Sequence, residues 1–371
     1  MSALFSEGQL GGLKLANRIA VSPMCQYMAR QGAANSWHTV HLGSLAMSGA
    51  AALFIEATAV EAVGRITPSD LGLWDDDTES ALRRTLSAVR DVSATPLVLQ
   101  LAHAGRKGSS QVPWEGGQWI PASSPQGWVT EAPSAVPQKD GEAPPLAMDA
   151  AALLRVRGAF VAAAQRAARL GIDALELHAA HGYLLHQFLS PLSNRRTDAY
   201  GGKLENRLRY PLEVFDAVRD AFPSERPIGI KISATDWVES GWDLGQSLVF
   251  AEALKARGID WISVSSGGIS PLQKIQLAPG YQVPFAEAVR KATGLKTIAV
   301  GLIDDAQQAE TIIAAGQADF VALARGMLYD PRWPWHAAAQ LGVPIAAPPP
   351  YWRAPPRKHA ALFQGAKFGT R

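Results

Sequence analysis

The sequence predicts an α/β protein folded as a single (β/α)8 barrel, and three observations lead to this fold class. Short, continuous apolar runs recur along the chain, segments with apolar residues at helical spacing follow them, and glycines stand just past several of those segments. Continuous apolar runs are typical of parallel strands that are covered on both faces. Strict alternation of eight strand and helix units favours closure into a TIM barrel. A doubly wound sheet is the alternative, although no Gly-x-Gly-x-x-Gly fingerprint follows the first predicted strand.

The predicted barrel strands are the apolar runs, which in chain order are Arg18–Ser22, Ala52–Glu56, Pro96–Leu101, Ala174–His178, Pro227–Ile232, Trp261–Ser265, Lys296–Gly301 and Asp319–Leu323. A helical stripe precedes the fourth of them and consists of Leu153, Val156, Phe160, Ala163 and Ala167. Gly171, Gly258 and Gly316 stand where a glycine is expected just past the end of a helix. The chain, residues 1–371, is therefore expected to form one domain.

Three segments do not fit the repeat. Gly8–Leu15 is expected to form a hairpin that plugs the bottom of the barrel. Residues 113–145, within a longer excursion over 104–148, are rich in Pro, Gly, Ser and Trp, which predicts a lid or a small hairpin rather than an inert surface loop. The tail over 342–371 contains Pro348–Pro356, which is incompatible with a helix or a central strand and predicts an extended segment that docks on another surface and does not pack as a ninth unit.

Composition excludes several classes of protein. The hydrophobic fraction of 47% is too high for a disordered chain. The 35 basic residues nearly balance 33 acidic ones and form no long run, which argues against nucleic acid as the main partner. The single cysteine cannot form an internal disulfide, and neither a signal-peptide pattern nor a membrane-spanning apolar run is present. The expectation is a soluble cytoplasmic protein with no membrane partner.

Polar residues follow nearly every predicted strand, at the end of the barrel where catalytic groups of this fold lie. Gly301 and Arg325 follow the last two strands, where barrels commonly bind phosphate, and Asp304 is expected to open the next helix. The structural alternative is a tight turn at Gly301 and a surface ion pair for Arg325. Lys231 lies inside an apolar strand, which predicts either a Schiff-base lysine or a fixed cation opposite an anionic cofactor.

His178 and His181 lie three positions apart where a strand becomes a helix. Such a pair can direct two N–H donors at one oxygen and stabilise negative charge there, or it can bind a metal, or it can be structural. Tyr183 follows as a proton source, although a lone tyrosine is more often a core aromatic. Cys25 would need a neighbouring base, such as His103 or His181, to act as a nucleophile, and otherwise it is a small buried hydrophobe.

These residues belong to longer motifs, which are Asn17–Cys25, Glu56–Thr58, Gln100–Lys107, His178–Tyr183 and Leu189–Arg207. Together, and over almost the whole chain, they resemble the Old Yellow Enzyme family of flavin-dependent ene-reductases and its thermophilic-like bacterial subclass. The block from Thr197 to Arg207, with its Tyr-Gly-Gly and Glu-Asn-Arg elements, is the most specific.

The resemblance implies non-covalent FMN. Contacts to its ring would come from Pro23, Met24, Cys25, Ala57, Gln100 and Lys231, and contacts to its phosphate from Gly301, Ala324 and Arg325. The cysteine would tune the flavin and not act as a nucleophile. Two residues depart from the family pattern: Lys231 stands where many relatives have Arg, which keeps the charge but loses the bidentate fork, and Ala324 replaces a common Gly.

The resemblance also implies the chemistry. NADPH or NADH would reduce the flavin and leave, and an α,β-unsaturated carbonyl or nitro compound would follow in ping-pong order. His178 and His181 would bind the substrate oxygen while hydride passes from flavin N5, and Tyr183 would donate a proton. Tyr27 and Ile66 would line the substrate pocket. Arg353 would reach into a neighbouring subunit of a homodimer or dimer-built tetramer. The competing hypotheses are a metal-dependent barrel hydrolase or aldolase that uses His103, His178 and His181, and a flavin-binding redox sensor that uses Cys25.

Overall fold

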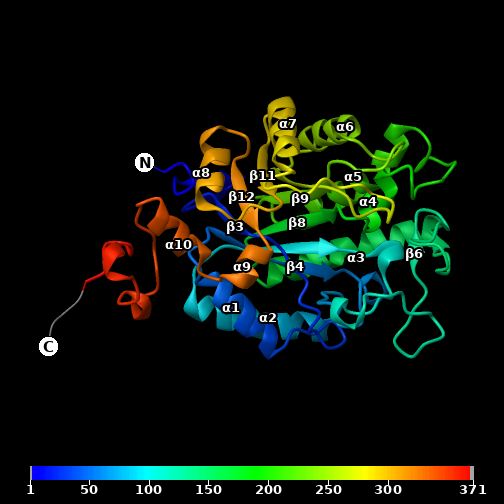
Figure 1. Ribbon diagram of the computed structural model, residues 1–371. Helices are drawn as coiled ribbons and strands as arrows, with labels where there is room; N and C mark the ends of the chain where they lie inside the picture. The colour runs from blue at the N-terminus through cyan, green and yellow to red at the C-terminus, as the bar shows by residue number, and fades with distance from the viewer. Residues whose placement is uncertain (1, 368–371) are drawn as a thin grey trace.

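The computed structural model describes residues 2–367, and its centre is a closed barrel of parallel strands (Figure 1). In chain order the barrel strands are β3 (Ile19–Val21), β4 (Ala52–Ala59), β5 (Leu97–Ala102), β8 (Ala174–Ala179), β9 (Ile228–Ser233), β10 (Trp261–Ser265), β11 (Lys296–Val300) and β12 (Phe320–Leu323). Each neighbour pair is parallel, and β12 closes onto β3. All eight predicted strands are present, so the predicted TIM barrel is confirmed.

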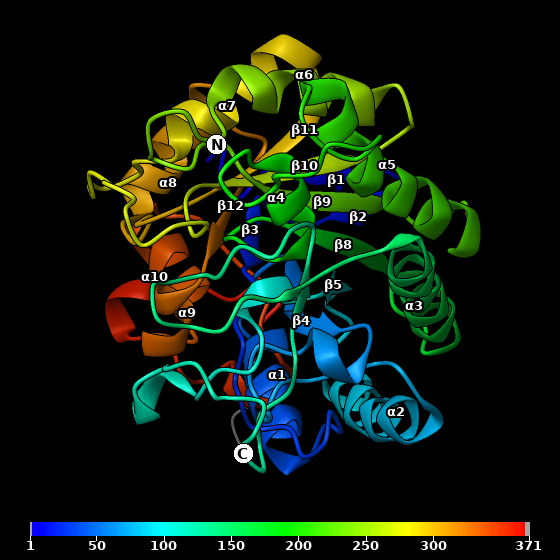
Figure 2. The ribbon, with the colours of Figure 1, turned by 90° about the vertical axis from the view of Figure 1, so that its right-hand side faces the viewer.

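Helices cover the outside of the barrel (Figure 2). They are α1 (Ser36–Ala46), α2 (Asp76–Val92), α3 (Ala150–Arg169), α4 (Leu184–Leu189), α5 (Leu204–Ala221), α6 (Leu244–Lys255), α7 (Val283–Thr293), α8 (Ala306–Ala314), α9 (Arg325–Tyr329) and α10 (Trp333–Gln340). The predicted stripe on α3 is buried. Gly171, Gly258 and Gly316 follow α3, α6 and α8 with φ of 72°, 78° and 68°, which confirms them as helix ends. Asp304 does not open α8: the carboxylate of Asp305 accepts from Gln308 N, so the cap lies one residue later than predicted.

The end of the barrel where the strands begin is closed by an apolar plug. The predicted hairpin is confirmed: β1 (Gly8–Leu10) and β2 (Leu13–Leu15) pair antiparallel. Leu10 packs in one buried cluster with Phe54, Trp261 and Phe320 from the barrel strands. Each fully buried side chain of this kind contributes about 1.5–3 kcal/mol of hydrophobic stabilisation. This end of the barrel therefore serves stability.

The excursion between β5 and α3 crosses the opposite end of the barrel (Figure 2). It contains β6 (Glu131–Ala132) and β7 (Leu146–Ala147), which pair in parallel, so the strands do not form the small hairpin considered as an alternative to a lid. Arg106 fixes the excursion to the barrel. Its guanidinium donates to Val136 O and Pro137 O within the excursion and to Ile269 O beyond β10. The excursion is thereby held over the carboxyl ends of the strands.

The tail turns back on α10. Ile345 N donates to Leu362 O at 2.8 Å, and Gln364 N donates to Ile345 O at 3.0 Å. Short 3-10 turns at Pro349–Tyr351 and Arg357–His359 separate the two partners, so the proline-rich segment is more compact than an extended tail. Trp335 on α10 packs against Phe363. Among residues 2–367, no helix combines the length and the apolarity needed to span a bilayer.

Candidate active site

A cavity of about 750 Å³ opens at the carboxyl ends of β3 and β9–β12, and we refer to it as the rim cavity. It brings together six of the residues selected from the sequence, which are Pro23, His181, Lys231, Gly301, Ala324 and Arg325. Its size falls within the range of small-molecule and cofactor sites. Residues from both ends of the chain thus meet at the edge predicted from the strand ends.

The mouth of the rim cavity is formed by the segments that follow β11 and β12. Gly301 has a φ of 115°, and a Cβ there would lie 2.5 Å from Nε2 of Gln282. Glycine is therefore required by the backbone conformation and by the close approach of Gln282, whose Nε2 donates to Val300 O. The exposed Arg325 begins α9 and also lines the cavity. This region presents backbone and a guanidinium, the groups that bind phosphate.

Lys231 forms the inner wall of the rim cavity. It lies on β9 with 4% of its surface exposed, and its Nζ donates to Ser22 Oγ at 3.2 Å. Burial lowers the pKa of Lys231, while the Glu176 carboxylate acts in the opposite direction and favours the charged form. A buried ammonium with a nearby carboxylate fits the fixed-cation interpretation better than a Schiff-base lysine, which needs its neutral form.

A buried carboxylate that the sequence analysis did not select lies beneath this lysine. Glu176 on β8 is fully buried and accepts from Gln100 Nε2 at 2.7 Å and from Ser263 Oγ. Because the amide nitrogen of Gln100 is directed at Glu176, its oxygen is directed away from it and is free to accept. Glu176 therefore fixes which end of the Gln100 amide is available to a ligand.

The two histidines lie side by side, with ring centroids 5.1 Å apart. Burial lowers the pKa of both imidazoles well below the usual value, and the nearby cations Lys231 and Lys107 lower it further, so both are neutral near pH 7. Nδ1 of His178 accepts from Ala180 N at 3.2 Å, which places its proton on Nε2. Nε2 of His181 lies 2.7 Å from Ser265 Oγ. Each neutral ring carries one N–H, and that of His181 is on Nδ1 when its Nε2 accepts from Ser265 Oγ.

The backbone at His181 is held in an uncommon conformation. Its φ is 56°, in the left-handed region, and Gly182 follows with a φ of 76°. His181 N donates to Ser233 Oγ at 2.9 Å, and Lys107 Nζ donates to His181 O at 2.8 Å and to Gly268 O at 3.1 Å. Such strain persists only where the surroundings fix it, and it is concentrated at functional sites. Here it turns the His181 ring toward the rim cavity.

Tyr183 completes the cluster at the start of α4. Its ring is perpendicular to that of His178, with centroids 4.8 Å apart. Burial raises the pKa of the Tyr183 phenol well above 10, so the phenol retains its proton. Lys107 Nζ lies 5.0 Å from the centre of the same ring. Burial and the charges of Arg106 and Lys139 lower the pKa of Lys107 to about 8.

Cys25 lies among buried acidic groups. Burial, Asp70 and Glu56 raise its pKa, so the thiol form dominates and a nucleophilic thiolate is disfavoured. Glu56 sits where the β4–β5 register is irregular, between Ile55 and Thr58, and burial raises its pKa to about 8. Its Oε2 accepts from Gln26 N. Ala57 follows Glu56 in the same irregularity and borders a small void together with Ile66 and Tyr183.

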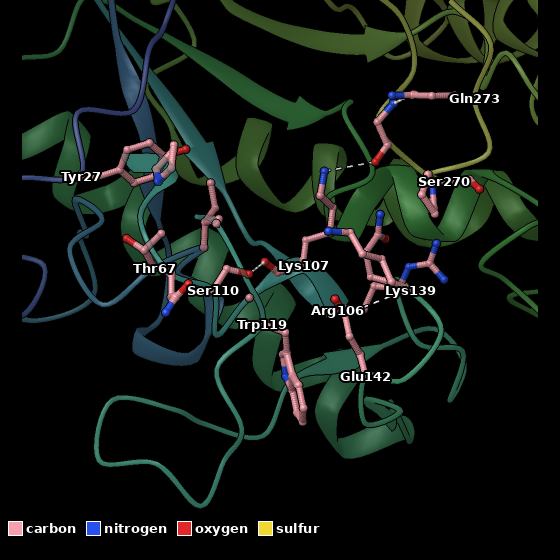
Figure 3. A pocket seen from close by; sticks show the side chains of 18 residues that line it. Tyr27, Thr67, Arg106, Lys107, Ser110, Trp119, Lys139, Glu142, Ser270 and Gln273 are labelled. Atoms are coloured by element: carbon pink, nitrogen blue, oxygen red, sulfur yellow. Dashed lines mark hydrogen bonds between the residues drawn. The ribbon is translucent and has the colours of Figure 1, made fainter. Parts of the chain in front are cut away.

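A second cavity, of about 310 Å³, lies between this cluster and the excursion, and we refer to it as the excursion cavity (Figure 3). Tyr27 and Ile66, the residues expected to line a substrate pocket, are on its wall. Asp70, which the sequence analysis also missed, shapes this wall by accepting from Ile66 N and Thr67 N. Lys107 belongs both to the wall of this cavity and to the contacts around Tyr183.

Two residues considered in the sequence lie apart from the cluster. His103 is bound to Glu61 through Nε2 at 2.9 Å and accepts from Gly105 N through Nδ1, which is a structural role. Arg353 is exposed on the tail, whose Pro344–Pro349 segment packs near the loops that precede β4 and β5, at the plugged end. Within residues 2–367, no three His, Cys, Asp or Glu side chains are placed to hold a metal.

Comparison with known proteins gives a consistent set of relatives. A family model described as the NADH:flavin oxidoreductase / NADH oxidase family matches residues 3–343. The chain is 42% identical over 354 residues to NADPH dehydrogenase of Geobacillus thermodenitrificans, covering 95% of this chain and 98% of that protein. It is 41% identical over 356 residues to NADPH dehydrogenase of Listeria innocua, covering 95% and 99%. Among solved structures, morphinone reductase superposes with a TM-score of 0.75 at 28% identity, covering 99% and 94%.

Proposed function

This chain belongs to the NADH:flavin oxidoreductase / NADH oxidase family and within it to the Old Yellow Enzymes, and we propose that it reduces the C=C bond of α,β-unsaturated carbonyl and nitro compounds. The family establishes an NADPH:FMN oxidoreductase that uses FMN and NAD(P)H. The observation that carries this proposed reaction is a cluster of three rings: the centroid of His178 lies 5.1 Å from that of His181 and 4.8 Å from that of Tyr183.

The rim cavity fits FMN on the chemistry of its donors. Lys231 supplies a buried cation at the inner wall, and Arg325 supplies an exposed one at the mouth. This arrangement suits a ligand with a phosphate at one end and, at the other, a ring that becomes negative on reduction. Bound FMN supplies the hydride donor, at N5. We assign ring contacts to Pro23, Met24, Cys25, Ala57, Gln100 and Lys231, and phosphate contacts to Gly301, Ala324 and Arg325.

His178 and His181 hold the substrate oxygen in this proposal. Saturating the double bond places a hydride on the β-carbon, and negative charge then develops on the carbonyl or nitro oxygen. Two N–H donors fixed in a buried site stabilise that charge more than they stabilise the neutral substrate. The neighbouring cations Lys107 and Lys231, which already lower the pKa of both imidazoles, act on the substrate oxygen in the same favourable direction.

Tyr183 then donates its phenolic proton to the α-carbon, which completes the addition of one hydride and one proton. Its raised pKa keeps that proton in place until the carbanion forms. Lys107 lies over the ring and stabilises the phenolate that remains until a proton returns from solvent. Tyr27 and Ile66 are assigned to the wall of the substrate pocket.

The proposal includes self-association. Arg353 is exposed and lies toward the plugged end, so within its own chain it does not join the cluster. We therefore assign it to the site of a neighbouring subunit in a homodimer or dimer-built tetramer. Gel filtration with an activity measurement checks this, and a fully active monomer would contradict it.

The test of the reaction is enone-dependent NADPH oxidation under nitrogen. We expect the purified protein to be yellow, the wild type to saturate the enone, and both His178→Ala and Tyr183→Phe to lose about 10²- to 10³-fold in turnover. Flavin reduction by NADPH should persist in both variants. A wild type that reduces its flavin but leaves every enone unchanged would overturn the proposed reaction.

A further inference from the structure

The excursion cavity extends away from the catalytic cluster toward a group of cations. Figure 3 shows Tyr27 and Thr67 at one end of the view, Arg106 and Lys139 at the other, and Lys107 between them. Two residues link the cavity to the cluster: Lys107 lines the cavity and its Nζ lies over the Tyr183 ring, and Ile66 lines both the cavity and the small void that borders Tyr183. A ligand whose reactive end lies at the histidines could therefore extend into it.

The residues that line this cavity carry an excess of positive charge. Its charged lining residues are three cations, Arg106, Lys107 and Lys139, and one carboxylate, Glu142. The cations are close enough for Arg106 and Lys139 to lower the pKa of Lys107. Glu142 offsets them only in part, and its carboxylate accepts from the backbone N–H of Lys139 at 3.3 Å. An anion in the cavity would relieve the repulsion among the cations.

Arg106 gives the cavity a rigid, positively charged wall. It is 6% exposed, three backbone carbonyls hold its terminal nitrogens, and its Nε has no partner among residues 2–367. The side chains of Ser110, Gln111 and Gln273 add neutral hydrogen-bonding groups to the lining. Lys139, by contrast, is exposed at the mouth and free to follow a ligand. A fixed guanidinium and a mobile ammonium are a suitable pair for phosphate oxygens.

We propose that the excursion cavity binds the diphosphate of the nicotinamide reductant, with Arg106 and Lys139 as its cationic contacts. This deepens the proposed function by assigning a place to the reductant. In a nicotinamide dinucleotide one ribose separates the diphosphate from the reactive ring, whereas the 2′-phosphate lies beyond a second ribose. Arg106 and Lys139 line the same cavity as Lys107, which lies over the Tyr183 ring, and so they match the nearer phosphates. NADPH and NADH would share this contact.

The test compares three hydride donors with Lys139→Ala and with the charge reversal Lys139→Glu. NADPH and NADH carry the diphosphate, and 1-benzyl-1,4-dihydronicotinamide carries no phosphate. Anaerobic loss of flavin absorbance is followed by stopped flow, because this readout needs no enone. Lys274→Ala is the matched control, since Lys274 is an exposed lysine on the neighbouring loop that does not line the cavity.

We expect Lys139→Ala to raise the half-saturating concentration of NADPH and of NADH by about fivefold, and Lys139→Glu by tenfold or more, with the benzyl donor unchanged. Added salt should weaken binding of both dinucleotides to the wild type, and less so to Lys139→Ala. Lys274→Ala should behave as the wild type.

Three results would overturn the proposal. Unchanged saturation by both dinucleotides would show that Lys139 does not contact the reductant. An effect on NADPH alone would place the 2′-phosphate in the cavity instead. An equal effect on the benzyl donor would show that the substitution disturbs the catalytic cluster. These measurements follow flavin reduction alone, so they remain valid if the protein does not reduce enones. The proposed ene-reduction and the proposed diphosphate site can therefore be disproved independently.

Discussion

The two ends of the barrel are built from the same strands but in opposite ways. At the end where the strands begin, Leu10 from the hairpin packs with Trp261 and Phe320. At the end where they finish, the interior contains the charged or polar groups Lys231, Glu176 and His178, all of them buried. Burying a polar group lowers the stability of the fold unless the group finds a partner. The polar end therefore contributes less to stability and holds the groups that the reaction needs.

The comparison shows how a barrel separates these two demands. The large plug residues Leu10, Trp261 and Phe320 stabilise the fold without lining the rim cavity, which leaves the other end free to hold a left-handed residue at His181 and buried cations. Substitutions at the plug should therefore change stability alone, and substitutions at the rim should change function more than stability.

The largest expected effect is on stability, at the apolar end. Phe320→Ala should lower the free energy of unfolding by about 3–5 kcal/mol, because it leaves a cavity among fully buried side chains. Urea unfolding measures this, and Leu154→Ala, at a side chain that is 59% exposed, serves as the control. Turnover per bound flavin should equal that of the wild type. A loss of turnover in the folded variant would break the separation between the two ends.

A pH effect comes next, at the polar end. Burial raises the pKa of Glu56 to about 8, so the folded protein holds a proton that the unfolded chain releases. This stability is fully present below the ordinary carboxyl pKa and is lost as pH rises through about 8. With FMN saturating, the unfolding free energy should fall by about 2 kcal/mol between pH 5 and pH 8.5. Glu56→Gln should flatten this slope, and an unchanged slope would exclude Glu56 as its cause.

Glu176→Gln should weaken the binding of the cofactor. The amide keeps the shape but cannot hold both Gln100 and Ser263 as the carboxylate does, so the Gln100 amide loses its fixed orientation. We expect FMN to bind about tenfold more weakly, measured by recovery of flavin fluorescence on dissociation. The apoprotein should also lose stability, because the buried Lys231 ammonium loses the carboxylate that favours its charged form. Wild-type FMN affinity would show that Glu176 does not position Gln100.

Much of this architecture could be predicted from the sequence, because each strand is marked by an apolar run of neighbouring residues. The apolar runs marked every strand, and since the strands of a barrel end together, the residues that follow them converge at one rim. Lys231, His181 and Arg325 were found in this way, and they line one cavity. Their individual roles came from the resemblance, since a short polar motif does not define its ligand.

What was missed depends on contacts between distant segments. Glu176 lies within the same apolar run as His178, and its partners come from β5 and β10. The signal that selected Lys231, a charge inside an apolar strand, applied equally to Glu176 and could have found it. No comparable signal existed for Lys107 or Asp70, because the contact of Lys107 with His181 O forms only in the folded barrel and that of Asp70 with Ile66 N only in the folded turn.

The smallest effect separates two adjacent carboxylates at the polar end. Asp305 caps α8 through Gln308 N, whereas Asp304 lines the rim cavity and its backbone oxygen accepts from Trp333 Nε1. Asp305→Ala should cost about 1 kcal/mol of unfolding free energy and leave FMN affinity unchanged. Asp304→Ala should change stability by less than about 0.5 kcal/mol, since its side chain is not in the cap. Urea unfolding of the two variants, with FMN affinity measured in parallel, distinguishes them. If Asp304→Ala were the costlier substitution, the cap would lie where the sequence placed it. One residue at the polar end, Asp304, would then both start a helix and line the cavity.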